Sequence, residues 1–165
     1  MLSMSGIEQR TRLRRRKLSE RRFWRRFGRL EHERLEFKSA VDHVTESVVA
    51  MAMTEGGTIL IGISDQPRVI GCRVDQGVLD RLANVAHETQ VDLVIEQLDV
   101  GGHAVLAVSV PPVAPRVVTT PDGRLLRRVG GSNRPLRGES VTRFLRARES
   151  LGSAGTLSPA ADGQV

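Results

Sequence analysis

The chain has 165 residues, of which 39% are hydrophobic and 27% charged, a composition typical of one globular domain. A single cysteine, Cys72, excludes an internal disulfide bond and a zinc cluster built from cysteines. No apolar run approaches the roughly 18 residues of a membrane span, and no apolar stretch follows the basic N-terminus as in a secretory signal. We therefore expect a cytoplasmic protein without a membrane partner.

The net charge of +6 is distributed unevenly along the chain. Residues 1–30 hold 11 Arg and Lys against two acids, residues 31–112 hold five against 13, and residues 113–150 hold nine against three. Two basic segments around an acidic one indicate a polyanionic partner held from two sides. Charge alone therefore favours nucleic-acid contact, with improved solubility as the alternative role of a basic segment.

Residues 1–30 are expected to form a loosely ordered basic arm. Phe23, Trp24 and Phe27 suit one side of a short helix, which Gly28 would end. The segment as a whole has no clean apolar period, so we expect it to lie outside the core and to order on binding. Nucleic acid is the favoured surface for such a segment, and a membrane surface or a partner protein are the alternatives.

Residues 31–150 are interpreted as one compact domain. The run Thr58–Ile63 is typical of a strand buried on both faces, and Gly101-Gly102 of a tight hairpin link. In chain order the predicted elements are a strand over 35–38, a helix over 39–53, strands over 58–63 and 69–72, a helix over 76–87, strands over 91–100, 103–110, 116–119 and 124–129, and a helix over 139–148.

The predicted fold is therefore α/β of the α+β kind, with a mixed sheet of about six short strands and two or three packed helices. Pro121-Asp122-Gly123 indicates a second hairpin, and Gly130–Asn133 a flexible polar loop. Residues 151–165, rich in Gly, Ser, Ala and Pro, are predicted to be a disordered tail.

Three acidic residues are candidates for metal chemistry. Glu31 and Glu36 lie five positions apart and converge only if the chain bends between them, so solvated charges are the favoured reading. Asp65 follows the buried strand, where a carboxylate suits either a cation or a turn. Gly56-Gly57 lacks the lysine and the length of a phosphate-binding loop, so ATP binding is not supported.

The segment from Arg127 to Arg134 is a candidate phosphate site. Its arginines leave a strand and enter a glycine-rich loop, which combines guanidinium forks with exposed backbone amides. A solvated hairpin end is the alternative interpretation.

Five motifs in order resemble the Schlafen AlbA-like domain. Residues 31–38, EHERLEFK, resemble its opening ESxxxEFK signature, and residues 50–65 resemble its AFANTxGGxLLIGVxD segment. Residues 68–71 match the turn that follows, residues 103–111 match a strand ending in Val-Pro, and residues 128–133 match a late R-x-G-S loop. The chain is thus identified as a member of this family.

The resemblance implies a fold related to Alba-type nucleic-acid-binding proteins, with the 35–38 strand beside the 58–63 strand. Prokaryotic members are described as DNA-binding domains. Some animal members cleave transfer and ribosomal RNA with three carboxylates, which fall here on Glu31, Glu36 and Asp65. The resemblance implies that this triad would lie close together and hold Mg²⁺ or Mn²⁺.

The chain also departs from the family pattern. His32 replaces the serine of the opening motif, and Met51-Ala52-Met53 replaces Phe-Ala-Asn. The zinc ligands of the animal proteins are absent. Those nucleases grip RNA with two such lobes, so a homodimer or larger complex is left open for this chain.

Three hypotheses follow. The favoured one is a module that binds DNA or RNA through phosphates without reading sequence and needs no cofactor. The alternatives are a divalent-metal-dependent endoribonuclease and an adaptor in a regulatory or defence complex. The residues expected at the nucleic acid are Lys38, Arg116, Arg127, Arg128, Ser132, Asn133, Arg134 and Arg137.

Overall fold

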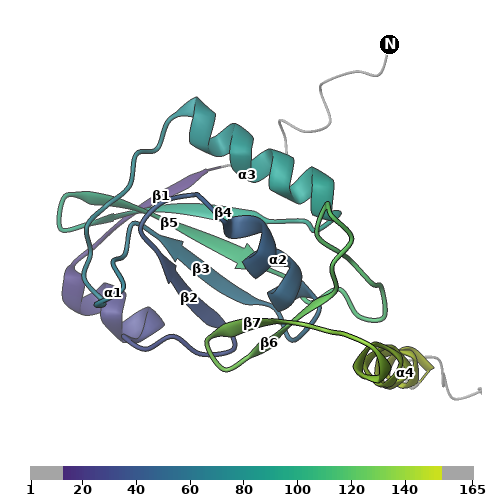
Figure 1. The fold of residues 1–165 in the computed structure, drawn as a ribbon. Coiled ribbons are helices and arrows are strands. Elements are labelled where there is room, and N and C mark those ends of the chain that lie inside the picture. Colours follow the sequence, from purple (N-terminus) through teal and green to yellow (C-terminus); the bar gives the residue numbers. More distant parts are fainter. Residues whose placement is uncertain (1–12, 154–165) are drawn as a thin grey trace, which may run out of the picture.

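The computed structural model describes residues 13–153, which form a mixed α and β fold as the sequence predicts (Figure 1). None of the helices in this part of the chain is long and apolar enough to cross a membrane. In chain order the elements are β1 (Arg14–Leu18), α1 (Glu20–Phe27), β2 (Leu35–Lys38), α2 (Val44–Ala52), β3 (Gly57–Ile61), α3 (Gln76–Thr89), β4 (Val94–Val100), β5 (His103–Val110), β6 (Leu126–Val129), β7 (Ser132–Pro135) and α4 (Glu139–Ser153).

Five strands form one mixed sheet in the order β1-β4-β5-β3-β2, and β6 and β7 form a separate hairpin. β2 runs parallel to β3, with Leu35 opposite Thr58, so the neighbouring strands that the family resemblance implies are confirmed. β5 runs antiparallel to both β3 and β4. Gly101 and Gly102 link β4 to β5 with positive φ angles of 59° and 88°, which glycine adopts without strain.

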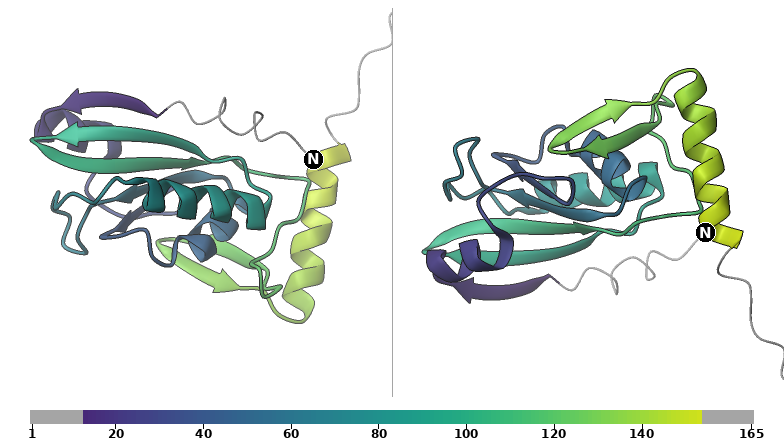
Figure 2. Two further views of the ribbon diagram at one scale, coloured as in Figure 1. Left: turned by 90° about the horizontal axis from the view of Figure 1, so that it is seen from above. Right: turned by 90° about the horizontal axis from the view of Figure 1, so that it is seen from below.

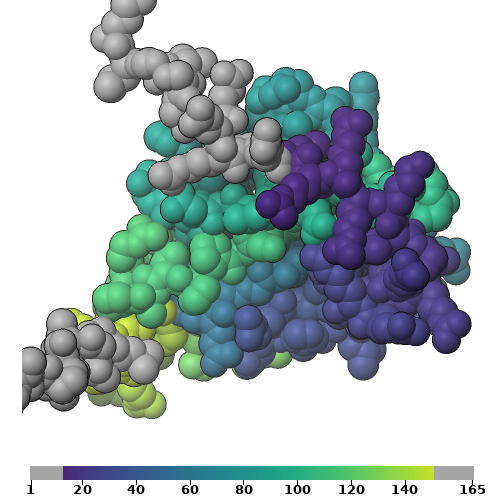
Figure 3. Space-filling model, turned by 180° about the vertical axis from the view of Figure 1, so that it is seen from behind, coloured from purple at the N-terminus to yellow at the C-terminus, as the bar shows by residue number. Residues whose placement is uncertain are grey.

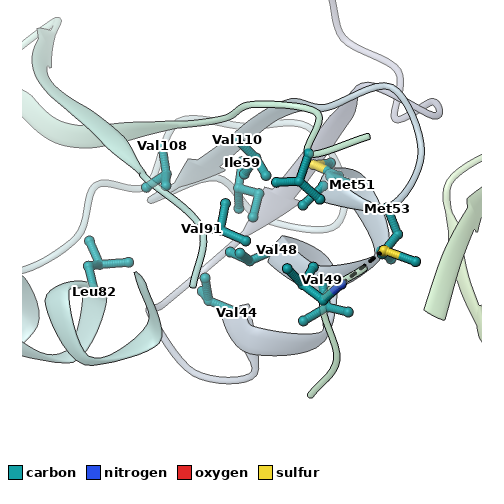
Figure 4. Close-up of a cluster of buried hydrophobic side chains, with 14 of the residues drawn as sticks. Val44, Val48, Val49, Met51, Met53, Ile59, Leu82, Val91, Val108 and Val110 are labelled. Carbon is teal, nitrogen blue, oxygen red and sulfur yellow. Dashed lines mark hydrogen bonds between the residues drawn. The ribbon is translucent and has the colours of Figure 1, made fainter. Parts of the chain in front are cut away.

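Helices cover both faces of the sheet. α2 and α3 lie on one face and α1 lies on the other (Figures 1 and 2). Successive side chains of β3 point to opposite faces of the sheet. Ile59 and Ile61 pack with α2, whereas Leu60 packs with α1. This two-sided burial explains the continuous apolar run of β3. Figure 4 shows the α2 face, where Val48 and other α2 side chains meet strand residues such as Ile59.

The structure corrects the expectation of a loosely ordered arm for residues 14–27. β1 pairs in parallel with β4 along one edge of the sheet, and α1 buries Phe23 and Trp24, which are 0% and 7% exposed. The predicted helix end is confirmed, since Gly28 has a φ of 85° and donates its N–H to the Trp24 carbonyl. An edge strand is stabilised by backbone hydrogen bonds and tolerates charged side chains, so β1 has no apolar period.

Three local predictions are wrong. The strand expected over 69–72 is reduced to a single bridge between Ile63 and Val69. The helix expected over 39–53 begins at Val44, because His43 adopts the left-handed conformation (φ 57°). The final helix continues beyond 148, to Ser153. Residues 1–12 of the expected arm and 154–165 of the expected tail lie outside the described residues.

The second hairpin also differs from its prediction. The strand expected over 116–119 does not form, and β6 pairs with β7 around Gly130-Gly131. The segment expected to be the hairpin turn forms a local turn instead, in which the Thr120 N–H bonds the Arg124 carbonyl at 3.1 Å. The reason lies in β6, whose side chains alternate so that Leu126 and Arg128 both point inward. In the observed pairing Arg128 has a buried partner, Glu36, at 2.7 Å.

Candidate nucleic-acid interface

The candidate interface is the β6–β7 hairpin, which lies beside α2 and β2 (Figure 1). Side chains of β6 alternate strictly, with Leu126 and Arg128 buried and Arg127 and Val129 exposed. The inward side of the hairpin therefore fastens it to the domain, and the outward side is available to a ligand.

A buried polar network fastens the hairpin. The Arg128 guanidinium donates from Nη1 to Glu36 Oε2 at 2.7 Å and to Asn133 Oδ1 at 2.7 Å. The other carboxylate oxygen of Glu36 accepts from Ser47 Oγ at 2.9 Å and lies 3.0 Å from Lys38 Nζ. Asn133 Nδ2 closes the network by donating to Ser47 Oγ at 3.1 Å. The network thus joins β2, α2, β6 and β7 around one carboxylate.

Three of the residues expected at the nucleic acid belong to this network. The side chain of Arg128 is 1% exposed and pairs with Glu36, so in this structure its guanidinium is turned away from a ligand. Asn133 uses both ends of its amide group inside the network, and the ammonium group of Lys38 pairs with Glu36. Strict alternation in the strand Leu-Arg-Arg-Val already separates Arg127 from Arg128, and this signal distinguishes the exposed arginine from the buried one.

The outward side of the hairpin carries two arginines. Arg127 and Arg134 are directly opposite each other in the β6–β7 register, and both are exposed. Neither has a carboxylate partner among residues 13–153. Like charges directly opposite each other destabilise a strand pair, and a bound anion relieves that repulsion. Ser132 and Arg137, also expected at the nucleic acid, are exposed on or just after β7.

The turn that precedes β6 is fixed to α2 by charge. Arg124 donates from Nη2 to Glu46 Oε1 at 2.6 Å and from Nε to Asp122 Oδ2 at 2.7 Å. The Thr120 hydroxyl bonds the other Asp122 oxygen at 2.5 Å, and together with Arg124 it lowers the pKa of the Asp122 carboxyl group. These bonds therefore fix the turn to α2 just before β6 begins.

Arg116 is held elsewhere. Its guanidinium donates from Nη1 and Nη2 to the carbonyl of Gln90, at 3.2 and 3.3 Å, just after α3 ends. Its own carbonyl accepts from Arg148 Nη2 at 2.6 Å. Arg148 also donates to the Met53 carbonyl at 2.5 Å, and burial lowers the pKa of its guanidinium. Arg116 therefore belongs to the anchor of α4.

The three candidate metal ligands point to different surroundings. Glu31 Oε1 accepts the backbone N–H of Phe37 at 2.7 Å, Glu36 lies in the buried network, and Asp65 is exposed in the turn after β3. Within residues 13–153, no group of three or more His, Cys, Asp and Glu side chains is placed to hold a metal ion. The expected convergence of the three carboxylates is therefore not found in this structure.

Comparison with known proteins agrees with the fold. A sequence model of the family described as Schlafen, AlbA_2 matches residues 31–137, which include β2 through β7. The crystal structure of the DIP2311 protein from Corynebacterium diphtheriae is similar, with a TM-score of 0.58 and 26% sequence identity. The likeness covers 70% of this chain but 27% of that protein. No curated protein matches the chain.

Proposed function

Because the chain belongs to the Schlafen AlbA_2 family, whose role is related to nucleic acid, we propose that it binds the phosphate backbone of DNA or RNA through its β6–β7 hairpin. The observation that carries this proposal is the exposed pair Arg127 and Arg134, directly opposite each other and without a carboxylate partner in the described part of the chain.

The chemistry of the pair suits phosphate. Side chains directly opposite each other on a strand pair start from β-carbons about 5 Å apart, so two guanidinium groups can reach one phosphate or two successive ones. Guanidinium forks match phosphate oxygens in geometry as well as in charge. Backbone contacts carry no sequence information, so we expect the hairpin to bind different sequences with similar affinity.

The buried network beneath the pair supports the same role. The side chains of Arg128 and Asn133 extend from the inward side of the hairpin and bind it to Glu36 and Ser47. A hairpin that is already ordered loses little conformational entropy when a ligand binds. The exposed arginines are therefore presented from a preorganised support.

The environment of Glu36 favours binding over metal-dependent cleavage. Its two carboxylate oxygens already face cations, Arg128 at 2.7 Å and Lys38 at 3.0 Å. A metal ion at Glu36 would have to displace at least one of these partners. With Glu31 bonded to the backbone of β2, the geometry supports a binding module.

The test neutralises the exposed pair with Arg127→Gln and Arg134→Gln in one variant. We expect roughly tenfold weaker binding to labelled duplex DNA and duplex RNA, and a log–log salt slope smaller by about two, since each phosphate contact contributes about one. Fluorescence anisotropy at several salt concentrations measures both quantities. The thermal midpoint should be unchanged or higher because the repulsion between the two arginines is removed.

A matched control neutralises Arg143 and Arg146, which are exposed on α4. This control removes the same charge from a different surface and should change affinity much less. Equal affinity of the hairpin variant and the unmodified chain would contradict the proposal. A loss confined to one nucleic-acid sequence would indicate base recognition in place of backbone contact.

A further inference from the structure

A second basic surface lies outside the part of the chain that the family model matches. We call it the strand–helix surface. Among residues 14–29 the single acidic residue is Glu20. In Figure 3 the purple side chains of β1 and α1 project from one part of the molecule. The surface is made of Arg14, Arg16, Arg21, Arg22, Arg25, Arg26 and Arg29, all of which are exposed.

The helix is amphipathic. Four arginines share one side of α1 and its end. Arg25 and Arg29 follow Arg22 at successive helical spacings of three and four residues, and Arg26 lies next to Arg25 and three positions before Arg29. The opposite side carries the buried aromatic residues that pack on the sheet. The amphipathic pattern of α1 therefore directs the arginines to solvent and the aromatic residues into the core.

The strand adds charge on the same face of the sheet. In the parallel register Arg14 is opposite Glu96 and Arg16 is opposite Leu98, and Leu98 packs in the core beneath α1. Residues that are opposite each other in a sheet point to the same face. Arg14 and Arg16 therefore project on the α1 side of the sheet edge.

Most of these cations have no carboxylate partner in the described part of the chain. Arg26 pairs with Glu96 at 2.8 Å, and the Arg29 guanidinium lies 4.8 Å from the centre of the Trp24 ring. The other five make no ion pair with a carboxylate in residues 13–153. Their mutual repulsion opposes folding and is relieved by a polyanion.

We propose that the strand–helix surface binds the phosphate backbone of duplex nucleic acid, in the same complex as the hairpin. This inference rests on the proposed function and extends it to a second, preformed surface. The hairpin tip lies beside the loop that follows α1, where the Gly130 N–H donates to Glu33 Oε1 at 3.4 Å. This proximity is the basis for placing both surfaces on one duplex.

The surface fits a duplex better than a single strand or a membrane. Phe23 and Trp24 are buried, and the Arg26 guanidinium lies over Phe27 at 4.6 Å. Exposed aromatic rings, on which unpaired bases stack, are therefore missing from the described part of this surface. Leu30, next to Arg29, is the one strongly exposed large apolar side chain among residues 14–30, which is too little to enter a bilayer.

The test uses the full chain with Arg14→Gln, Arg16→Gln, Arg22→Gln and Arg25→Gln combined. Glutamine keeps helix propensity close to that of arginine, and none of the four side chains has a carboxylate partner among the described residues. We expect duplex affinity to fall at least about tenfold and the salt slope to decrease by up to about four. The control removes the same charge with Arg68→Gln, Arg81→Gln, Arg143→Gln and Arg146→Gln, all exposed elsewhere.

The outcomes separate this inference from the proposed function. Weaker duplex binding by the strand–helix variant, with the control variant close to the unmodified chain, supports the inference. Unchanged duplex binding by the strand–helix variant, while the hairpin variant is weakened, overturns the inference and leaves the proposed function standing. If neither variant is weakened, both fail. Loss of binding to phosphatidylserine vesicles, with duplex binding unchanged, would overturn it in favour of a lipid surface.

Discussion

Arg128 has a structural role that the sequence around it does not reveal. Sequence places it among the phosphate-binding arginines, whereas the structure buries it against Glu36 at 2.7 Å. Removing one member of a buried ion pair leaves an uncompensated charge, which costs about 3–5 kcal/mol. The residue is therefore expected to act on stability and on the position of the hairpin.

We predict that Arg128→Met lowers the free energy of unfolding by about 3 kcal/mol, because Glu36 keeps its charge and loses its main partner. Urea denaturation measures this change. Arg127→Met on the same strand is the matched control and should change stability by less than about 0.5 kcal/mol, since Arg127 is exposed. Adding Glu36→Gln to Arg128→Met should recover part of the loss. Equal stability of the two single variants would contradict the buried assignment.

At the scale of elements, α1 is the part of the fold whose contribution differs most from expectation. Phe23 is 0% exposed and lies in a core that also contains Phe37, Leu60 and Leu98. Its ring is 4.9 Å from that of Trp24 in an edge-on arrangement. One face of the sheet therefore depends on α1 for its cover.

We predict that Phe23→Ala destabilises the protein by about 3–5 kcal/mol, the usual cost of removing a fully buried aromatic side chain. Arg21→Ala, on the exposed side of the same helix, should be nearly neutral. Deletion of residues 1–28 should abolish the cooperative thermal transition, since it removes both an edge strand and the cover of the core. A truncated chain with an unchanged midpoint would show that the sheet folds without α1.

The sequence predicts well those elements whose burial leaves a pattern. β2 and β5 occur at their expected positions, because their apolar residues contact the core. β1 leaves no such pattern, since its four basic residues are all exposed and its stability comes from backbone bonds to β4. The predicted second hairpin is wrong because two glycine-containing turns compete, and the strands pair around Gly130-Gly131. In the pairing that forms, Arg128 points inward to a partner 92 positions away in the chain, a contact that no local pattern reveals.

The candidate site is less predictable than the fold for a related reason. The sequence names Arg127 and Arg134 as candidates, but their position opposite each other follows from the β6–β7 pairing, which the sequence does not provide. The carboxylates Glu31 and Glu36 lie close in sequence, but one bonds the backbone of β2 and the other enters the buried network. Such choices depend on contacts between distant segments.

At the scale of the whole molecule, one acidic residue, Glu33, lies beside the hairpin tip on the loop that follows α1. Glu33 is exposed, and its carboxylate is 3.4 Å from the Gly130 N–H at the hairpin tip. A duplex that spans the strand–helix surface and the hairpin must pass this carboxylate. Its charge therefore repels the phosphates of the bound duplex.

We predict that Glu33→Gln tightens duplex binding by about twofold at low salt, the effect of one charge several ångströms from a phosphate in a water-like medium. The gain should disappear as the salt concentration rises, because screening shortens the reach of surface charges. Glu88→Gln, on the exposed side of α3, removes the same charge away from the proposed path and should change affinity less. Anisotropy titrations with the same labelled duplex compare the two variants. Equal affinities of the two variants would show that the duplex does not pass between the two basic surfaces.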